Sequence, residues 1–187
     1  DAAYNAYRNA VGFPEIVSAL CQEPCRNVCP RRHTDEAIAL RLLEGASVAY
    51  ARNRNPVDYN VPLKNKKIAV IGAGISGLSC ALRLSAKKYE VTIYEKSGRI
   101  GGQLWEKLPP QTFLADIERQ FMYEEYTLYL NHEITDLNML FHTPLQYNAV
   151  YVATGEGGAD FGLKLKEGTS LKTARSGVFM GGSLMGK

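Results

Sequence analysis

The chain has 187 residues, of which 45% are hydrophobic, and its 22 basic and 19 acidic residues leave a net charge of +3. This length suits one globular domain of average size with an appendage. The basic residues are scattered rather than clustered, which argues against a nucleic-acid-binding surface. No apolar run approaches 18 residues, and nothing near residue 1 resembles a signal peptide, so we expect a cytoplasmic protein without a membrane span.

Three cysteines stand close together near the start of the chain. Cys21, Cys25 and Cys29 follow the spacing C-x3-C-x3-C, and the last one precedes a proline. Without a secretory signal, disulfides are not the default interpretation. Pro24 interrupts a regular helix between the first two cysteines, and turns of this kind let several thiolates converge on one soft metal centre. The pattern therefore predicts metal ligation.

Residues 34–51 have the pattern of a helix. Thr34 offers an N-cap hydroxyl, and Asp35 and Glu36 place acids in the first turn. Apolar residues then recur at helical spacing, at Ile38, Leu42, Leu43, Ala46 and Ala49. A polar stretch with two prolines follows up to residue 67 and predicts a linker. We therefore expect a helical domain at residues 1–60 and a second domain at residues 61–187.

The second domain opens with the most specific motif of the chain. An apolar run at residues 68–71 meets Gly72-x-Gly74-x-x-Gly77, a helical pattern follows, and a strand at residues 91–94 ends on Glu95. This order of strand, glycine-rich turn, helix, strand and acid is typical of dinucleotide-binding domains. In such domains the phosphates of the dinucleotide bind at the helix N-terminus, and the acid accepts hydrogen bonds from a ribose of the dinucleotide. The negative charge of Glu95 disfavours a 2′-phosphate, so NADP is not expected at this position.

The residues after Glu95 favour FAD over NAD. A glycine pair, Gly101-Gly102, stands six residues beyond the acid. An extended FAD passes this loop and needs close backbone approach, whereas a simple NAD dehydrogenase does not need the pair. Arg99 is placed to lie along the pyrophosphate.

The rest of the chain shows further elements in order. Residues 113–126 suit a helix with Ile117, Phe121 and Met122 facing inward, and residues 128–134 suit a strand. A buried strand at residues 149–152 ends in Ala153-Thr154-Gly155. Another strand, at residues 176–180, runs into Gly181-Gly182.

Taken together, these segments resemble the FAD-binding domain of the pyridine nucleotide-disulfide oxidoreductase superfamily. Residues 11–105 are most similar to the small subunit of glutamate synthase and to the N-terminal region of dihydropyrimidine dehydrogenase. The resemblance implies an α/β fold, with a Rossmann-like parallel sheet flanked by helices and preceded by the small helical domain with its cysteines. It implies FAD contacts at Gly72, Gly74, Ile75, Ser76, Gly77, Glu95, Lys96, Arg99, Gly101, Gly102, Gln103, Leu104, Ala153, Thr154, Gly155, Gly182 and Ser183.

The same resemblance favours iron–sulfur clusters over zinc at the cysteines. In the glutamate synthase family, a run of this spacing contributes to two four-iron clusters, and an oxygen-bearing side chain completes one of them. Glu44 stands at that position here. The family's upstream cysteine motif is absent, so Cys21, Cys25, Cys29 and Glu44 form an incomplete ligand set. We expect the missing ligands before Asp1 or on another chain, and we take Cys80 as a buried structural residue.

Two departures from the family bear on function. Ser183 stands where an aspartate usually binds the ribityl chain of FAD. Only 21 residues separate Gly155 from Gly177, which is too few for the family's NADPH-binding domain. We therefore expect this chain to be one part of a longer enzyme.

Three functions follow from these residues. The first is an FAD-dependent electron-transfer domain that exchanges electrons with iron–sulfur clusters. The second is a fragment of an NAD(P)H-dependent oxidoreductase of the glutamate synthase type, with the nicotinamide site outside this chain. The third is a non-enzymatic assembly subunit that has lost FAD. The first two imply partner domains or subunits with iron–sulfur clusters or a nicotinamide site.

Overall fold

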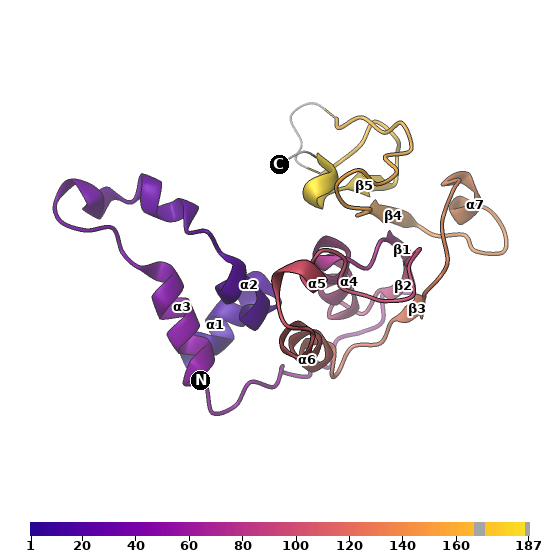
Figure 1. Ribbon diagram of the computed structural model, residues 1–187. Helices are drawn as coiled ribbons and strands as arrows, with labels where there is room; N and C mark the ends of the chain where they lie inside the picture. The colour runs from indigo at the N-terminus through magenta and orange to yellow at the C-terminus, as the bar shows by residue number, and fades with distance from the viewer. Residues whose placement is uncertain (167–170, 186–187) are drawn as a thin grey trace. The chain divides into compact units, whose positions relative to one another are not determined.

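The computed structural model describes residues 1–166 and 171–185 (Figure 1). Two compact units make up the chain. The first contains Asp1–Val57 and Lys107–Met122, and the second contains Asp58–Glu106 and Tyr123–Lys187. The expected division was at residue 60, whereas these units divide at residue 57 and group residues 107–122 with the N-terminal unit. Within the described ranges, no helix is both long and apolar enough to span a membrane.

A parallel five-stranded sheet with the order β3-β2-β1-β4-β5 forms the centre of the second unit (Figure 1). The strands are β1 (Lys67–Ile71), β2 (Glu90–Tyr94), β3 (Thr127–Tyr129), β4 (Ala149–Val152) and β5 (Val178–Met180). All four ladders are parallel. The strand order reverses between β1 and β4, and in open parallel sheets ligands bind at the carboxyl ends of the strands at such a point. This topology confirms the predicted α/β Rossmann-like fold.

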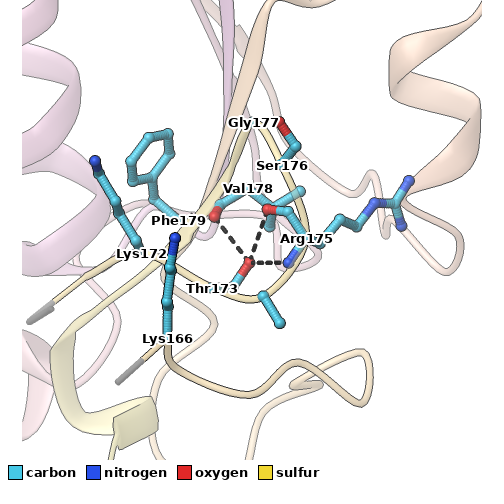
Figure 2. A pocket seen from close by; sticks show the side chains of 9 residues that line it. Lys166, Lys172, Thr173, Arg175, Ser176, Gly177, Val178 and Phe179 are labelled. Carbon is cyan, nitrogen blue, oxygen red and sulfur yellow. Dashed lines mark hydrogen bonds between the residues drawn. The ribbon is translucent and has the colours of Figure 1, made fainter. Parts of the chain in front are cut away.

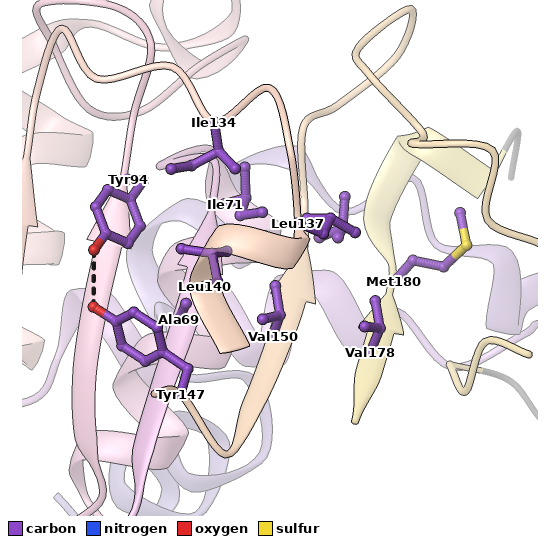
Figure 3. Close-up of a cluster of buried hydrophobic side chains, with 11 residues drawn as sticks. Ala69, Ile71, Tyr94, Ile134, Leu137, Leu140, Tyr147, Val150, Val178 and Met180 are labelled. Atoms are coloured by element: carbon purple, nitrogen blue, oxygen red, sulfur yellow. Dashed lines mark hydrogen bonds between the residues drawn. The ribbon is translucent and has the colours of Figure 1, made fainter. Parts of the chain in front are cut away.

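Helices of the second unit follow the strands. The longest is α4 (Ile75–Ser85), which starts four residues after β1, and shorter ones are α5 (Leu104–Lys107), α7 (Asn138–Phe141) and the 3₁₀ helix η3 (Gly182–Met185). Residues Ile134, Leu137 and Leu140 cover one face of the sheet over Ala69 and Val150 (Figure 3). Within the same cluster, the hydroxyls of Tyr94 and Tyr147 are hydrogen-bonded at 2.9 Å. Burial of this apolar surface is the main source of stability for the sheet.

One predicted strand is shorter than expected. The pattern predicts a strand at residues 128–134, but β3 ends at Tyr129. Asn131 has a φ of 52°, and its amide donates to the carbonyl of Ser97 at 2.9 Å, while the amide of His132 donates to the carbonyl of Glu95 at 2.9 Å. The chain turns back over the end of β2 here, so the ladder cannot continue.

The connection between β4 and β5 ends in a tight turn around Thr173, which is buried. The Thr173 hydroxyl lies 2.9 Å from the carbonyl oxygen of Val178 and 3.1 Å from that of Arg175, and it accepts the Arg175 amide at 3.2 Å (Figure 2). Gly177, with a φ of 75°, precedes the first residue of β5. The predicted strand at residues 176–180 therefore begins two residues later, at Val178.

The first unit is a small helical assembly. Its helices are α1 (Ala2–Val11), α2 (Pro14–Leu20), η1 (Pro24–Val28), η2 (Pro30–His33), α3 (Leu40–Ala49) and α6 (Pro110–Gln120). Asp116 of α6 accepts the amides of Glu15 and Ile16, at 3.0 and 3.1 Å, and so caps the start of α2. Glu15 also pairs with Arg119 of α6. These contacts explain why α6 belongs to this unit.

The predicted start of one helix was wrong. The helix expected from Thr34 begins at Leu40, because the Thr34 amide closes η2 on the carbonyl of Arg31 and Asp35 pairs with the Arg31 guanidinium. Within α3, Leu42 and Leu43 are 73% and 62% exposed.

In α6 and the residue pair after it, the predicted inward face is confirmed at two of three positions. Ile117 and Phe121 are buried, and Met122 is 49% exposed. The helix ends at Gln120, so both Phe121 and Met122 follow it, and only Phe121 turns into the core.

Candidate cofactor-binding site

The glycine-rich turn after β1 has two positions that only glycine can occupy. Gly72 has a φ of 101°, and a Cβ atom there would lie 2.4 Å from the carbonyl oxygen of Ala153. At Gly77, a Cβ atom would lie 1.9 Å from the carbonyl oxygen of Gly72. The Gly72 amide donates to the carbonyl of Tyr94 at 2.8 Å. The turn is therefore packed tightly between the ends of β2 and β4.

Gly74 differs, because it borders open space. No described atom lies within 4 Å of the position that its Cβ would take. Helix α4 begins at the next residue, and the described chain supplies no side-chain hydrogen bond to its N-cap. The amide of Leu78 makes the first intrahelical bond, to the carbonyl of Gly74 at 2.9 Å. The earlier amides of the helix, together with its dipole, suit an anionic phosphate.

Glu95 is fixed beside this turn by two backbone amides. Its Oε2 accepts the amide of Ala73 at 2.7 Å, and its Oε1 accepts the amide of Ser97 at 2.8 Å. Each carboxylate oxygen has a second lone pair for a further donor. The side chain at the end of β2 is therefore held beside the Gly-rich turn and can accept further hydrogen bonds.

The glycine pair is attached to the first turn. The Gly101 amide donates to the carbonyl of Ala73 at 2.8 Å, and a Cβ atom at Gly102 would lie 3.2 Å from the Cα of Gly74. Close to the pair, Lys96, Arg99 and Gln103 are exposed, whereas Leu104 is buried. Leu104 is therefore placed to pack rather than to offer a polar contact.

Residues from β4 and β5 reach the same edge of the sheet. Gly182 follows β5 and has a φ of 76°, and a Cβ atom there would lie 2.7 Å from the Cβ of Ser76. The Ser76 hydroxyl is hydrogen-bonded to that of Tyr151 in β4 at 3.0 Å. Thr154 directs its hydroxyl to the carbonyl of Ala159 at 2.9 Å. The structure thus brings the predicted segments from β1, β2, β4 and β5 together around the start of α4, with Ser183 exposed beside them.

The predicted metal ligands lie in the first unit, in different elements. Cys21 follows α2, Cys25 is within η1, and Cys29 lies between η1 and η2. All three are free thiols of intermediate exposure, and Cys21 Sγ accepts the Glu23 amide at 3.4 Å. Within residues 1–166 and 171–185, no group of three His, Cys, Asp or Glu side chains is gathered as a metal site. An iron–sulfur cluster at these cysteines stays a prediction.

The sequence did not reveal which residues change the pKa values of the groups near these cysteines. Backbone hydrogen bonds, first from Ile38 and then from Arg31 and Arg32, lower the pKa of the Cys29 thiol. Burial raises the pKa of Tyr7, and Glu44 and Cys21 nearby raise it further. Such contacts depend on loop conformation and carry no sequence pattern.

Cys80 occupies a different environment, within α4 of the second unit. Burial raises the pKa of its thiol to about 11, which disfavours the thiolate that a metal site requires.

A pocket of about 320 Å³ lies elsewhere in this unit, lined by Lys166 and residues 172–179 (Figure 2). None of the predicted cofactor contacts lines it.

Comparison with known proteins agrees with this geometry. Residues 70–119 match the family described as the NAD(P)-binding Rossmann-like domain. The NADPH-Fe(3+) oxidoreductase subunit beta of Geobacter sulfurreducens is 32% identical over 114 residues, which cover 59% of this chain and 17% of that protein. The NADP(+)-dependent formate dehydrogenase subunit beta of Moorella thermoacetica is 28% identical over 175 residues, which cover 79% of this chain and 25% of that protein.

A third similar protein is also named for an NADPH-dependent enzyme. The NADPH glutamate synthase small chain of Bacillus subtilis is 29% identical over 99 residues, which cover 52% of this chain and 20% of that protein. The chain spans a quarter or less of the length of these three curated relatives. These findings agree with the predicted resemblance to the pyridine nucleotide-disulfide oxidoreductase superfamily, because the matched family is a Rossmann-like one and the relatives include the glutamate synthase small chain.

Proposed function

We propose that the second unit binds FAD and that the whole protein is an oxidoreductase in which FAD exchanges electrons with iron–sulfur clusters. The observation that carries this proposal is the convergence of Gly74, Glu95, Gly102 and Gly182 around the start of α4. Gly74 follows β1, Glu95 and Gly102 follow β2, and Gly182 follows β5. A Rossmann-like domain with this arrangement has the parts that an extended dinucleotide requires.

The residues present fit the adenosine and pyrophosphate portions of FAD. The open space at Gly74 admits a phosphate to the backbone, and the first amides of α4 donate to its oxygens. Glu95, held by Ala73 and Ser97, accepts the ribose hydroxyls. When bound, FAD supplies the electron-transfer chemistry, and the protein supplies binding and orientation.

The charge of Glu95 supports FAD rather than NADP at this site. A carboxylate at the ribose position repels a 2′-phosphate, whereas the adenosine ribose of FAD carries free hydroxyls. The names of the three relatives include NADPH or NADP(+). We assign that cofactor to the parts of those proteins that this chain does not match, and this is the second candidate function: a fragment of an NAD(P)H-dependent enzyme.

Iron–sulfur clusters are proposed for the first unit on the chemistry of its thiols. Backbone hydrogen bonds, the largest from Ile38, lower the pKa of the Cys29 thiol, and backbone amides are the kind of donor that surrounds cluster sulfurs. Cys21 and Glu44 both lie near Tyr7. The ligands that complete a cluster come, in this proposal, from another segment or subunit, and two of the relatives are named as subunits.

Equilibrium dialysis of the purified chain against FAD, NADH and NADPH tests the assignment of the cofactor. We expect FAD to bind at one molecule per chain and NADPH to bind at least tenfold more weakly. Glu95→Gln, which removes the negative charge, should reduce the difference between the affinities for FAD and NADPH. Tighter binding of NADPH than of FAD would overturn the assignment in favour of a nicotinamide site. Binding of none of the three would favour an assembly subunit without cofactor.

A further inference from the structure

Arg99 and Trp105 form a stacked pair in the loop that follows Glu95. The guanidinium carbon of Arg99 lies 4.2 Å from the centroid of the Trp105 ring. The indole N–H of Trp105 donates to the carbonyl of Ile100 at 2.8 Å. This bond restrains the indole ring over which the guanidinium lies. Stacking of this kind is a favourable cation–π interaction.

The pair encloses the glycine residues that touch the first turn. Gly101 and Gly102 lie between Arg99 and Trp105 in the sequence, and both contact the Gly-rich turn, through Ala73 and Gly74 respectively. The backbone of Arg99 therefore lies two residues from the hydrogen bond that joins this loop to the Gly-rich turn.

The charge of Arg99 is not neutralised by the described part of the chain. Its side chain makes no ion pair there, and it is exposed. The nearby carboxylate of Glu95 is directed to the amides of Ala73 and Ser97 instead. A guanidinium stacked by its face keeps the N–H groups at its edge available for a planar or tetrahedral oxyanion.

Resting on the proposed function, we infer that Trp105 is a positioning residue for the dinucleotide. It holds the Arg99 guanidinium so that the N–H groups at the edge donate to a phosphate oxygen of the ligand bound at the Gly-rich turn. Arg99 makes the contact, and Trp105 acts only through Arg99. Loss of the indole therefore weakens binding by freeing the arginine, not by removing a contact to the ligand.

A double-mutant cycle tests this inference, with the affinity for FAD measured by equilibrium dialysis. We expect Arg99→Gln to weaken binding roughly tenfold, and Trp105→Leu to weaken it about two- to fivefold. In the Arg99→Gln background, Trp105→Leu should have no further effect. Trp105→Phe keeps an aromatic face and should recover part of the affinity. Lys87→Gln, an exposed charge beyond the other end of α4, is the matched control and should leave the affinity unchanged.

Two further readouts separate this role from a structural one. Both Arg99→Gln and Trp105→Leu should reduce the salt dependence of FAD binding. The first substitution removes the positive charge, and the second no longer holds that charge beside the phosphate. Trp105 is the only tryptophan in the chain, so quenching of its emission by FAD reports occupancy directly. Additive effects of the two substitutions, or an unchanged salt dependence, would overturn the inference while FAD still binds. Failure of the wild-type chain to bind FAD would instead overturn the proposed function.

Discussion

The carboxylate of Glu95 at the end of β2 and the amide of Ala73 in the Gly-rich turn are joined by a hydrogen bond of 2.7 Å. The bond couples the two halves of the site, because the same turn begins α4 and the same carboxylate faces the proposed ribose position. We therefore expect the charge of Glu95 to affect the conformation of the turn and, under the proposed function, the choice of ligand.

Replacing Glu95 with glutamine should change the choice of ligand more than the fold. The amide oxygen of glutamine still accepts one backbone amide, so we expect the midpoint of thermal unfolding to fall by only a few degrees. The affinity for FAD should drop about tenfold, since a charge-assisted hydrogen bond is lost. Affinity measurements on both proteins check this, and an unchanged affinity for FAD would show that Glu95 does not contact the ribose.

Substitution at Gly77 should destabilise the second unit strongly. A Cβ atom there lies 1.9 Å from a backbone carbonyl oxygen, and backbone cannot yield as a flexible side chain can. We expect Gly77→Ala to reduce the free energy of unfolding by roughly 2 kcal/mol or more. Gly45→Ala in α3 is the matched control, because no described atom lies within 4 Å of its Cβ position. That variant should be neutral or more stable by about 0.5–1 kcal/mol, and equal losses in both would contradict the close packing at Gly77.

Substitution at Gly74 should separate binding from stability. The backbone there has a φ of −74°, which alanine adopts readily, and the space around its Cβ position is open in the described chain. We therefore expect Gly74→Ala to unfold at the same urea concentration as the wild type. The added methyl group occupies the proposed approach of the phosphate, so binding of FAD should fall at least tenfold. Unaltered binding would place the phosphates elsewhere.

Asp116 should make the stability of the first unit depend on pH. Its side chain is fully buried, and burial raises its pKa from 3.8 to about 6, against the opposing effect of the amide of Ile16. Because the folded pKa lies above the unfolded one, the folded state retains a proton that the unfolded state has released. The contribution is therefore complete below about pH 4 and is lost as pH rises to about 6, by on the order of 3 kcal/mol.

The variant Asp116→Asn provides the comparison for this effect, since its amide does not titrate. Urea unfolding at pH 4 and at pH 7 should show the wild type losing stability relative to the variant as pH rises. A constant difference between the two proteins across this range would mean that Asp116 titrates near its ordinary pKa.

The local motifs allowed much of the second unit to be predicted. The turn at Gly72 to Gly77 and the strands on either side depend on neighbouring residues, and the structure has them where the pattern predicts. The assignment of α6 to the first unit was missed, because it depends on Asp116 reaching amides about 100 positions away in the sequence. The stacking of Arg99 on Trp105 was missed for a related reason: it needs the loop conformation that the Gly101 hydrogen bond imposes.

The helix start was missed through a competing local interaction. Thr34 has the side chain of an N-cap, but its amide closes the preceding 3₁₀ turn, and Asp35 pairs backward with Arg31. The residue types alone do not show whether Thr34 and Asp35 start a helix or close the preceding 3₁₀ turn. The exposure of Leu42 and Leu43 could not be predicted from the periodic pattern. The pattern gives the spacing of apolar residues, but it does not say which neighbouring element covers a helix face.

The most direct test of the central claim is the visible absorption spectrum of the chain purified without oxygen and supplied with FAD, before and after acid release of its chromophores. We predict flavin bands that correspond to one FAD per chain. A broad iron–sulfur absorption in addition would mean that Cys21, Cys25 and Cys29 suffice to hold a cluster. The absence of flavin from a folded chain after addition of FAD would contradict the proposed function.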